Sequence, residues 1–257
     1  MPQDFRDPNT AREWDADTSY YNPMRPEQLE MLLALAAAEY QPGQTILDLG
    51  LGSGQVEALL FERIPGAQVV GVDASAAMLE IARERLQPYA AQYSTLLHDL
   101  TQIDTLTLPA RDYGIVISIQ TLHHLDDAQM QRAYAFIHRT LRPGGLFLLL
   151  DRIAVEYASL FGCYQTLWAQ QDAQRGSHVG TQEGATFAEH QAKNRDRADI
   201  PLGLARHLEL LRAAGFEAAC LHLYTHRALF AGRKSQLLTP AEFEANCLAQ
   251  RSEKVLE

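Results

Sequence analysis

The sequence predicts an α/β protein with a doubly wound, Rossmann-like and mostly parallel sheet. Its predicted strands are unbroken apolar runs, which is typical of strands covered by helices on both faces. They alternate with helical patterns, the order that produces parallel β-α-β units. A glycine-rich turn, residues 50–54, directly follows the first predicted strand. Because open α/β sheets bind ligands at the carboxyl ends of their strands, we expect the functional site at that edge.

Composition narrows the possible classes of protein. The 257 residues are 47% apolar, which suits one domain with insertions. The net charge of −10 disfavours binding to nucleic-acid phosphates. The sequence lacks an apolar run of about 18 residues and a signal-peptide pattern, so we expect a cytoplasmic protein without membrane contact. Cys163, Cys220 and Cys247 form no C-x-x-C pair, and no metal site is expected.

The predicted elements follow one another at regular spacing. Residues 1–24 are expected to be irregular, and a helix begins at Pro26, because proline suits a first turn. Ser75 is the expected N-cap of a later helix, and Asp126 or Asp127 that of another. Pro143-Gly144-Gly145 is expected to end the latter helix. The predicted strands are Thr45–Leu49, Gln68–Asp73, Ser94–Leu97, Tyr113–Ile119, Leu146–Leu150, Ala218–Tyr224 and Arg227–Ala231.

These elements predict five segments. About fifty residues after the fifth strand lack a strand pattern and hold large aromatics followed by a polar stretch, so we interpret them as a helical lid over the sheet edge. The expected segments are an N-terminal cap and helix (1–42), a core (43–151), the lid and substrate-specificity insertion (152–201), a helix with the last two strands (202–234) and a tail helix (235–257).

Acidic residues end the second and third predicted strands. Asp73 lies 23 positions after Gly50, where a carboxylate can accept hydrogen bonds from both ribose hydroxyls. Asp99 lies within reach of an adenine amine. A dinucleotide fingerprint would need glycine or alanine at Gln55, so the turn disfavours NAD. We therefore expect an adenosyl ligand that carries positive charge and no phosphate.

Four motifs resemble those of class I S-adenosylmethionine (SAM)-dependent methyltransferases of the small-molecule type. They are residues 47–54 (LDLGLGSG), 70–75 (VGVDAS), 118–125 (SIQTLHHL) and 141–145 (LRPGG), in the order of the family. The resemblance implies seven strands, the last antiparallel, and SAM as cofactor with S-adenosylhomocysteine (SAH) as product. The cofactor-binding residues that it implies are Asp48, Gly50, Gly52, Asp73, Ala74, Met78, Asp99, Leu100 and Gln120.

Within this set, the resemblance places the methionine part near Gly50 and Gly52, the adenine between Met78 and Asp99-Leu100, and the transferred methyl group beside Gln120. Asp48 has two open interpretations. It either contacts the methionine amino group indirectly or holds the glycine turn by accepting backbone N–H bonds.

Further candidates lie outside these motifs. Tyr20 and Arg25 could close over the cofactor, with Arg25 pairing the methionine carboxylate. His123 and His124 are candidate general bases, and at most one should face the pocket, since adjacent residues leaving a strand point opposite ways. The candidate substrate contacts are Tyr21, Tyr164, Trp168, His178 and His190.

The predicted function is methyl transfer from SAM, by in-line displacement, to an O, N, C or S nucleophile of a small molecule. The segment 120–123 (QTLH) replaces the Asn-Pro-Pro-Tyr or Asp-Pro-Pro-Tyr of enzymes that methylate base amines, and no acidic cluster follows the fourth strand to hold a catalytic metal. An RNA-modifying enzyme that uses SAM or a SAM derivative and a SAM-binding protein without turnover remain open alternatives, whereas an NAD-dependent oxidoreductase is disfavoured. We expect a monomer or homodimer.

Overall fold

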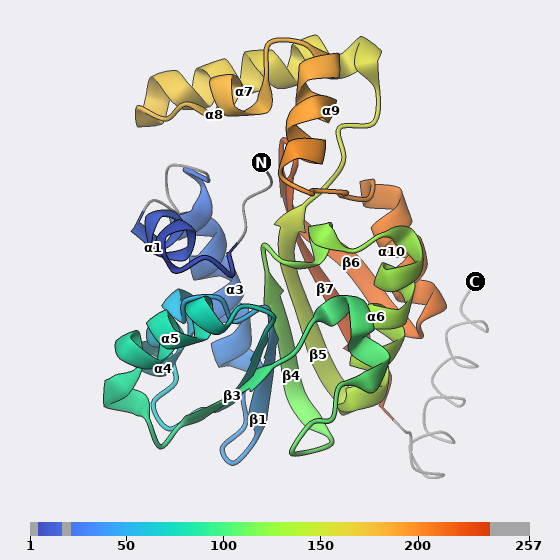
Figure 1. Ribbon diagram of the computed structural model, residues 1–257. Coiled ribbons are helices and arrows are strands. Elements are labelled where there is room, and N and C mark those ends of the chain that lie inside the picture. The colour runs from blue at the N-terminus through green and yellow to red at the C-terminus, as the bar shows by residue number, and fades with distance from the viewer. Residues whose placement is uncertain (1–4, 17–21, 237–257) are drawn as a thin grey trace, which may run out of the picture.

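The computed structural model describes residues 5–16 and 22–236. It contains a seven-stranded sheet in the order β3-β2-β1-β4-β5-β7-β6 (Figure 1). The first five strands are parallel, and β7 is antiparallel to both of its neighbours. This arrangement confirms the predicted fold class. The strands are β1 (Thr45–Leu49), β2 (Gln68–Asp73), β3 (Tyr93–Leu97), β4 (Tyr113–Ile119), β5 (Leu141–Arg152), β6 (Phe216–Tyr224) and β7 (Arg227–Lys234).

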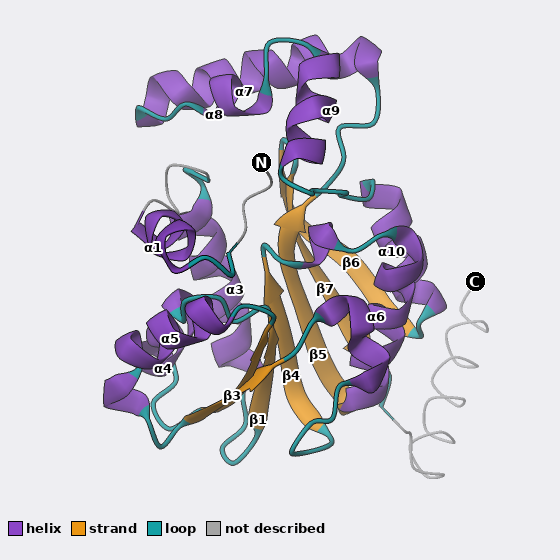
Figure 2. Ribbon diagram, in the orientation of Figure 1, coloured by secondary structure: helices purple, strands orange, loops and turns teal. Residues whose placement is uncertain are grey.

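Helices cover both faces of the sheet, as Figure 2 shows. On one face lie α3 (Arg25–Glu39) and α4 (Gln55–Arg63), whose apolar side chains share a cluster with those of β1, β2, β4 and β5. On the same face, α5 (Ala76–Arg85) contacts β2 and β3. On the other face lie α6 (Asp127–Thr140) and α10 (Leu204–Ala213). Because both faces are covered, the central strand β4 is buried along its whole length. Short 3-10 turns complete the connections: η1 (Gln87–Tyr89), η2 (Leu100–Thr105), η3 (Leu122–His124) and η4 (Ala158–Leu160).

Two helices that frame the site begin at the predicted caps. The Ser75 hydroxyl accepts a hydrogen bond from the backbone N–H of Met78 at 3.1 Å. Asp126 and Gln129 form a reciprocal capping box at the start of α6. Each cap satisfies backbone groups that a helix end leaves open, which fixes where the helix begins.

The N-terminal segment differs from its prediction, because α1 (Pro8–Ala16) is helical where irregular structure was expected. The Asp7 carboxylate accepts the backbone N–H of Thr10 at 2.9 Å and so caps this helix. The rings of Phe5 and Trp14 pack edge to face, with centroids 5.7 Å apart. Together they dock α1 on α5. The polar composition of this segment therefore did not predict α1, a helix with an N-terminal cap and one apolar face.

The fifth strand also differs from its prediction. It begins at Leu141 and passes through Pro143-Gly144, which was expected to separate the helix from a strand starting at Leu146. The pairing of β5 with β4 shifts register between Tyr113 and Ile115, and this irregularity accommodates the turn residues inside the strand. Of the expected tail helix over 235–257, residues 237–257 lie outside the part of the chain that is described.

The segment predicted to be a lid, which we continue to call the lid, contains three helices after β5. They are α7 (Phe161–Arg175), α8 (Val179–Glu183) and α9 (Phe187–Asp196), and they lie above the carboxyl edge of the sheet (Figure 1). It has a small apolar core of its own around Phe161 and Trp168. Within the described ranges, no helix combines the length and the apolar character needed to cross a membrane.

The glycine turn between β1 and α4 is held against two neighbouring strands. Gly50 has a φ of +97°, and its N–H donates to the carbonyl of Val72 at 2.8 Å. A Cβ atom at Gly50 would lie only 2.0 Å from the Thr121 hydroxyl oxygen, at the end of β4. Glycine is therefore required here both by backbone conformation and by close approach.

This double requirement predicts a large stability difference between two glycine-to-alanine variants. Gly66→Ala shares the left-handed backbone (φ +85°) but has open space around the new methyl group. We expect Gly50→Ala to lose about 1–3 kcal/mol more unfolding free energy than Gly66→Ala, measured by urea denaturation, because it adds overpacking to backbone strain. Equal losses would show that Thr121 moves aside freely.

Candidate active site

A cavity of about 380 Å³ lies at the carboxyl ends of β1, β2 and β4, and we call it the main cavity. Its volume falls within the range of small-molecule sites, roughly 300–1,000 Å³. From the predicted cofactor set it is lined by Gly50, Gly52, Asp73, Ala74 and Met78. Asp99, Leu100 and Gln120 from the same set also line it, together with His124. Eight of the nine residues implied by the motifs are thus brought together.

Asp73 is fixed between the glycine turn and the start of α5. Its carboxylate accepts the N–H of Gly52 and the N–H of Ser75, each at 2.8 Å. Burial raises the pKa of Asp73, while these two backbone donors act in the opposite direction. A carboxylate has about four lone-pair positions, so acceptor capacity remains for a hydroxyl donor of a ligand in the cavity.

Asp99 and two apolar side chains form the next part of the wall. The Asp99 carboxylate accepts the N–H of Thr101 at 2.9 Å and lies 3.8 Å from the guanidinium of Arg6. Its hydrogen bond from Thr101 lowers the pKa, so Asp99 is ionised at neutral pH. Met78 and Leu100 are buried apolar side chains. The arrangement offers an apolar surface for a flat ring with an acceptor beside it.

Two members of the predicted set lie behind this wall. Asp48 is buried, and burial together with the Glu57 carboxylate raises its pKa well above the usual value. Arg25 is also buried, with its guanidinium carbon 6.0 Å from the ring centroid of Trp14, and burial lowers its pKa to about 10. Neither residue lines the main cavity, whereas Trp14 does. Tyr20 and Tyr21 lie outside the described residues.

A second cavity of about 80 Å³, which we call the polar cavity, adjoins the main cavity beneath the lid. The two cavities share Phe5, Trp14, Gln120, His124 and Arg197 in their walls. The remaining wall is polar or charged. It consists of His123, Arg152, Gln182, Glu183, Asp199 and Arg227.

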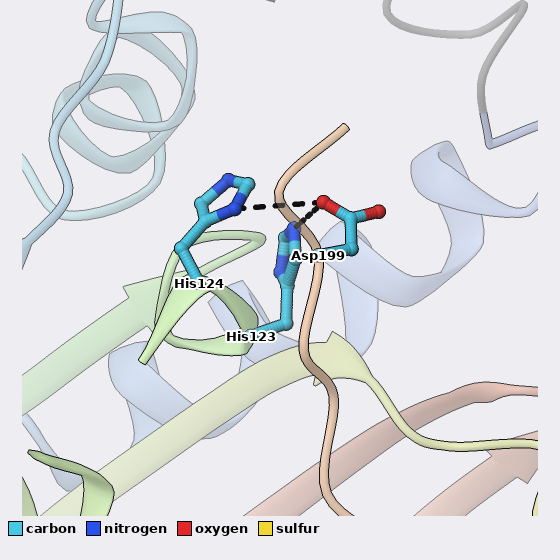
Figure 3. A group of neighbouring side chains, drawn as sticks. All are labelled: His123, His124 and Asp199. Atoms are coloured by element: carbon cyan, nitrogen blue, oxygen red, sulfur yellow. Dashed lines mark ion pairs between the residues drawn. The ribbon is translucent and has the colours of Figure 1, made fainter. Parts of the chain in front are cut away.

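His123 is held between the carboxylates of Asp151 and Asp199, and Figure 3 shows the contact with Asp199. Its Nδ1 lies 2.5 Å from Asp151 Oδ1, and its Nε2 lies 3.4 Å from Asp199 Oδ1. Burial by itself lowers the pKa of His123, but the two carboxylates outweigh it and raise the pKa to about 9. His123 is therefore an imidazolium at neutral pH and cannot act as a base.

His124 has the opposite character. Its side chain is 39% exposed, and its Nδ1 lies 3.1 Å from the carbonyl oxygen of Ala198. Because a carbonyl only accepts, Nδ1 carries the proton and Nε2 is left as an acceptor. Burial and the charge of His123 lower its pKa. Both histidines line the polar cavity, but of the two only His124 also lines the main cavity.

The same group could be considered for a metal. Ligand atoms of His123, His124 and Asp199 lie within 4.8 Å of one another. Asp199, however, is already bound by the Arg152 guanidinium at 2.9 Å, and Arg197 lines the same cavity. These cations disfavour a divalent ion, and the absence of a metal site stays a prediction.

The predicted substrate contacts in the lid do not reach either cavity. Trp168 is fully buried and donates from its indole N–H to His226 at 3.2 Å. Tyr164 and His190 pack against Trp168, and His178 lies at the start of α8. The large aromatics instead form the inside of the lid. The parts of the lid that line the cavities are Gln182 and Glu183 of α8 and the carboxyl end of the lid, residues 197–199.

Several site residues escaped the sequence analysis. Phe5 and Trp14 were recognised only as aromatic residues of the N-terminal segment and not as site residues. Asp151 directly follows the predicted fifth strand, Leu146–Leu150, so the rule that found Asp73 would have found it. Arg152 follows it, and Arg227 opens the antiparallel β7, whose first residues lie at the carboxyl edge of its parallel neighbours. Because the last strand was expected to be antiparallel, its first residue, Arg227, could have been predicted to lie at this edge.

Two wall residues have a left-handed backbone although they are not glycine. Gln120 has a φ of 56° and Ala198 a φ of 57°. The Gln120 amide oxygen accepts a hydrogen bond from Arg227 Nη1 at 2.5 Å, which fixes the side chain at the junction of the cavities. Such strain persists where surrounding contacts enforce it, and it concentrates at functional sites.

Comparisons with known proteins agree with this geometry. A methyltransferase domain family matches residues 46–145. A carboxy-S-adenosyl-L-methionine synthase of Pseudomonas putida is 31% identical over 203 residues, which cover 76% of this chain and 77% of that protein. An uncharacterized methyltransferase of Synechocystis is 35% identical over 119 residues, 46% of this chain and 52% of that protein.

Among solved structures, phosphoethanolamine N-methyltransferase 2 of Haemonchus contortus in complex with S-adenosyl-L-methionine has the same fold. The TM-score is 0.60 at 17% identity, and the match covers 82% of this chain and 53% of that chain. The likeness to this solved structure thus concerns the fold.

The charge of His123 predicts a pH-dependent stability. Its pKa is about 9 in the folded chain against 6.5 in the unfolded chain, so its contribution is present in full below pH 6.5 and is lost as pH rises through 9. We expect the unfolding free energy to fall by about 2 kcal/mol between pH 7 and pH 9 in urea titrations. His123→Gln should remove this fall, whereas His222→Gln on β6 should keep it. An unchanged pH dependence in His123→Gln would contradict the assignment.

Proposed function

Because the chain belongs to the class I SAM-dependent methyltransferase family, we propose that it transfers the methyl group of SAM to a small-molecule nucleophile held under the lid. The observation that carries this proposal is the junction of the two cavities. The main cavity, with the carboxylates expected for an adenosyl ligand, opens at Gln120 onto the polar cavity, and a neutral imidazole lines both.

The main cavity fits the cofactor in charge and shape. Asp73 would accept the ribose hydroxyls, and Asp99 the exocyclic amine of an adenine that lies against Met78 and Leu100. The methionine part would lie along the glycine turn, where the absence of a Cβ at Gly52 leaves the backbone accessible. When bound, SAM supplies an electrophilic methyl group on a positively charged sulfur. The two acidic side chains suit that charge.

The wall residues at the junction would align the acceptor and exclude water. Phe5 and Trp14 from the N-terminal segment, and Ala198 from the lid, enclose the space beside Gln120. Placing reacting groups in line within a closed site accounts for much of the acceleration in such displacements. No side chain of the protein has to act as a nucleophile.

His124 is the group best suited to accept a proton from the acceptor. It is neutral near pH 7, its Nδ1 proton is held by the carbonyl of Ala198, and its Nε2 has a free lone pair. His123 would act as a positioning residue, because its backbone N–H and ring are both bound to Asp151 and it precedes His124 directly.

A second candidate reaction is the formation of carboxy-SAM. The Pseudomonas putida relative is a carboxy-SAM synthase, and its alignment with this chain covers about three quarters of each protein. In addition, the polar cavity contains arginines that could hold a carboxylate. Mass spectrometry separates the two reactions. Methyl transfer yields SAH and an acceptor enlarged by one methyl group, whereas carboxy-SAM is heavier than SAM by one CO₂ unit.

Replacing the central carboxylate should weaken cofactor binding. We expect Asp73→Asn to lower the affinity for SAM about 10- to 100-fold in calorimetric titrations, because two hydrogen bonds to a charged acceptor become bonds to a neutral amide. The control is Glu62→Gln on the exposed side of α4, which removes the same charge away from the cavity and should leave the affinity unchanged. An affinity within twofold of the wild type in Asp73→Asn would refute the ribose assignment.

The role of His124 predicts both a rate and a pH profile. We expect His124→Gln to lower kcat about 100-fold with SAM affinity retained, measured by SAH release. In the wild type the rate should fall only below the ordinary histidine pKa of 6.5, since the base must be neutral and its pKa is lowered. That acid limb should vanish in His124→Gln. A persisting limb would assign the proton transfer to another group.

A further inference from the structure

The polar cavity carries an excess of positive charge. Four cationic side chains line it, whereas three carboxylates lie in its wall or directly behind it. The cations are Arg152, Arg197, Arg227 and the imidazolium of His123, and the carboxylates are Asp151, Glu183 and Asp199. Four positive against three negative groups leaves one positive charge uncompensated. Such a charge is costly in a buried place unless a ligand neutralises it.

The acceptor groups of this cavity are already engaged. Arg152 donates to Glu183 at 2.9 Å and pairs with Asp199, also at 2.9 Å. Among the described residues, neither carboxylate has a buried oxygen without a hydrogen-bond partner. Both carboxylates are thus already paired with cationic side chains of the protein.

Donor groups, by contrast, remain open. Arg152 Nε, Arg197 Nη1 and Gln120 Nε2 are buried atoms for which the described chain provides no hydrogen-bond partner. Arg197 Nη1 lies 3.6 Å from Glu183 Oε1, which is beyond hydrogen-bond distance. All three belong to residues that line the polar cavity. Buried donors are rarely left unpaired in folded proteins, so a ligand that brings oxygen acceptors is indicated.

We propose that the polar cavity binds the carboxylate of a small acidic methyl acceptor. One uncompensated positive charge matches a carboxylate, whereas a phosphate monoester would bring close to two negative charges. A volume of about 80 Å³ admits a group of a few atoms but not a ring system. Guanidinium groups offer the paired donors that a carboxylate accepts.

This inference rests on the proposed methyl transfer and adds the substrate class. Because Gln120 and His124 belong to both cavities, a carboxylate held in the polar cavity keeps the rest of the acceptor near the junction. The nucleophile therefore lies a short distance from the carboxylate, as in a hydroxy or amino acid.

The test uses acetate as a probe of the full-length protein saturated with SAH. We expect acetate to raise the melting temperature above that in chloride of equal ionic strength, since it binds the folded state. Arg197→Gln should weaken this acetate affinity about tenfold. Arg195→Gln, an exposed arginine two residues earlier, makes the same charge change and should retain the wild-type response.

The outcomes separate this inference from the proposed function. SAH affinity, titrated in each variant, reports on the main cavity, and the acetate response is measured with that variant saturated with SAH, because Arg197 lines both cavities. If the wild-type protein does not bind SAH, the proposed function is refuted. Normal SAH binding with no acetate effect, an equal loss in Arg195→Gln, or a stronger response to phosphate than to acetate would each overturn the carboxylate assignment. In acceptor screens, acids but not their primary amides should release SAH.

Discussion

The buried guanidinium of Arg152 is the contact on which the site depends, because it joins the sheet to the lid. It extends from the end of β5 and binds Glu183 of α8 and Asp199 after α9, each at 2.9 Å. Arg152, Glu183 and Asp199 are all buried. Removing one partner of such a group leaves an uncompensated buried charge, which typically costs about 3–5 kcal/mol. The lid can therefore carry a polar inner surface and still pack firmly against the sheet edge.

The contact between Arg152 and Asp199 helps to give the adjacent residues His123 and His124 different protonation states. Asp199, held by Arg152, faces both His123 and His124, but His123 alone has the second carboxylate of Asp151 at 2.5 Å. The first imidazole is therefore charged, and its charge helps to keep the second neutral. A pair of identical residues thus divides into one that positions and one that can accept a proton. The lid supplies both Asp199 and the Ala198 carbonyl, so this division requires the lid to be in place.

Cofactor chemistry and acceptor chemistry have separate origins in the chain. The main cavity is built mostly from turns that follow β1, β2, β3 and β4, whose positions are set by the parallel sheet. The polar cavity is built from residues far apart in sequence, such as Arg152, Arg197 and Arg227. The position of the main cavity follows from the parallel sheet, which is common to the fold. The polar cavity forms only where the chain that leaves the lid packs against the end of the sheet. This explains how one fold serves enzymes with different substrates.

The sequence by itself determined the strands except for the start of the fifth, the direction of the sheet and eight of the nine motif residues in the main cavity, because apolar periodicity and strand-end turns are local properties. It placed Asp73 and Asp99 correctly, since a parallel sheet brings successive carboxyl ends together. Only the tertiary structure decided that Trp168 and His190 pack inside the lid, that Asp48 does not line the main cavity, and that Arg197 and Asp199 line the polar cavity. Those positions depend on long-range packing and on competing buried charges, which no local pattern encodes.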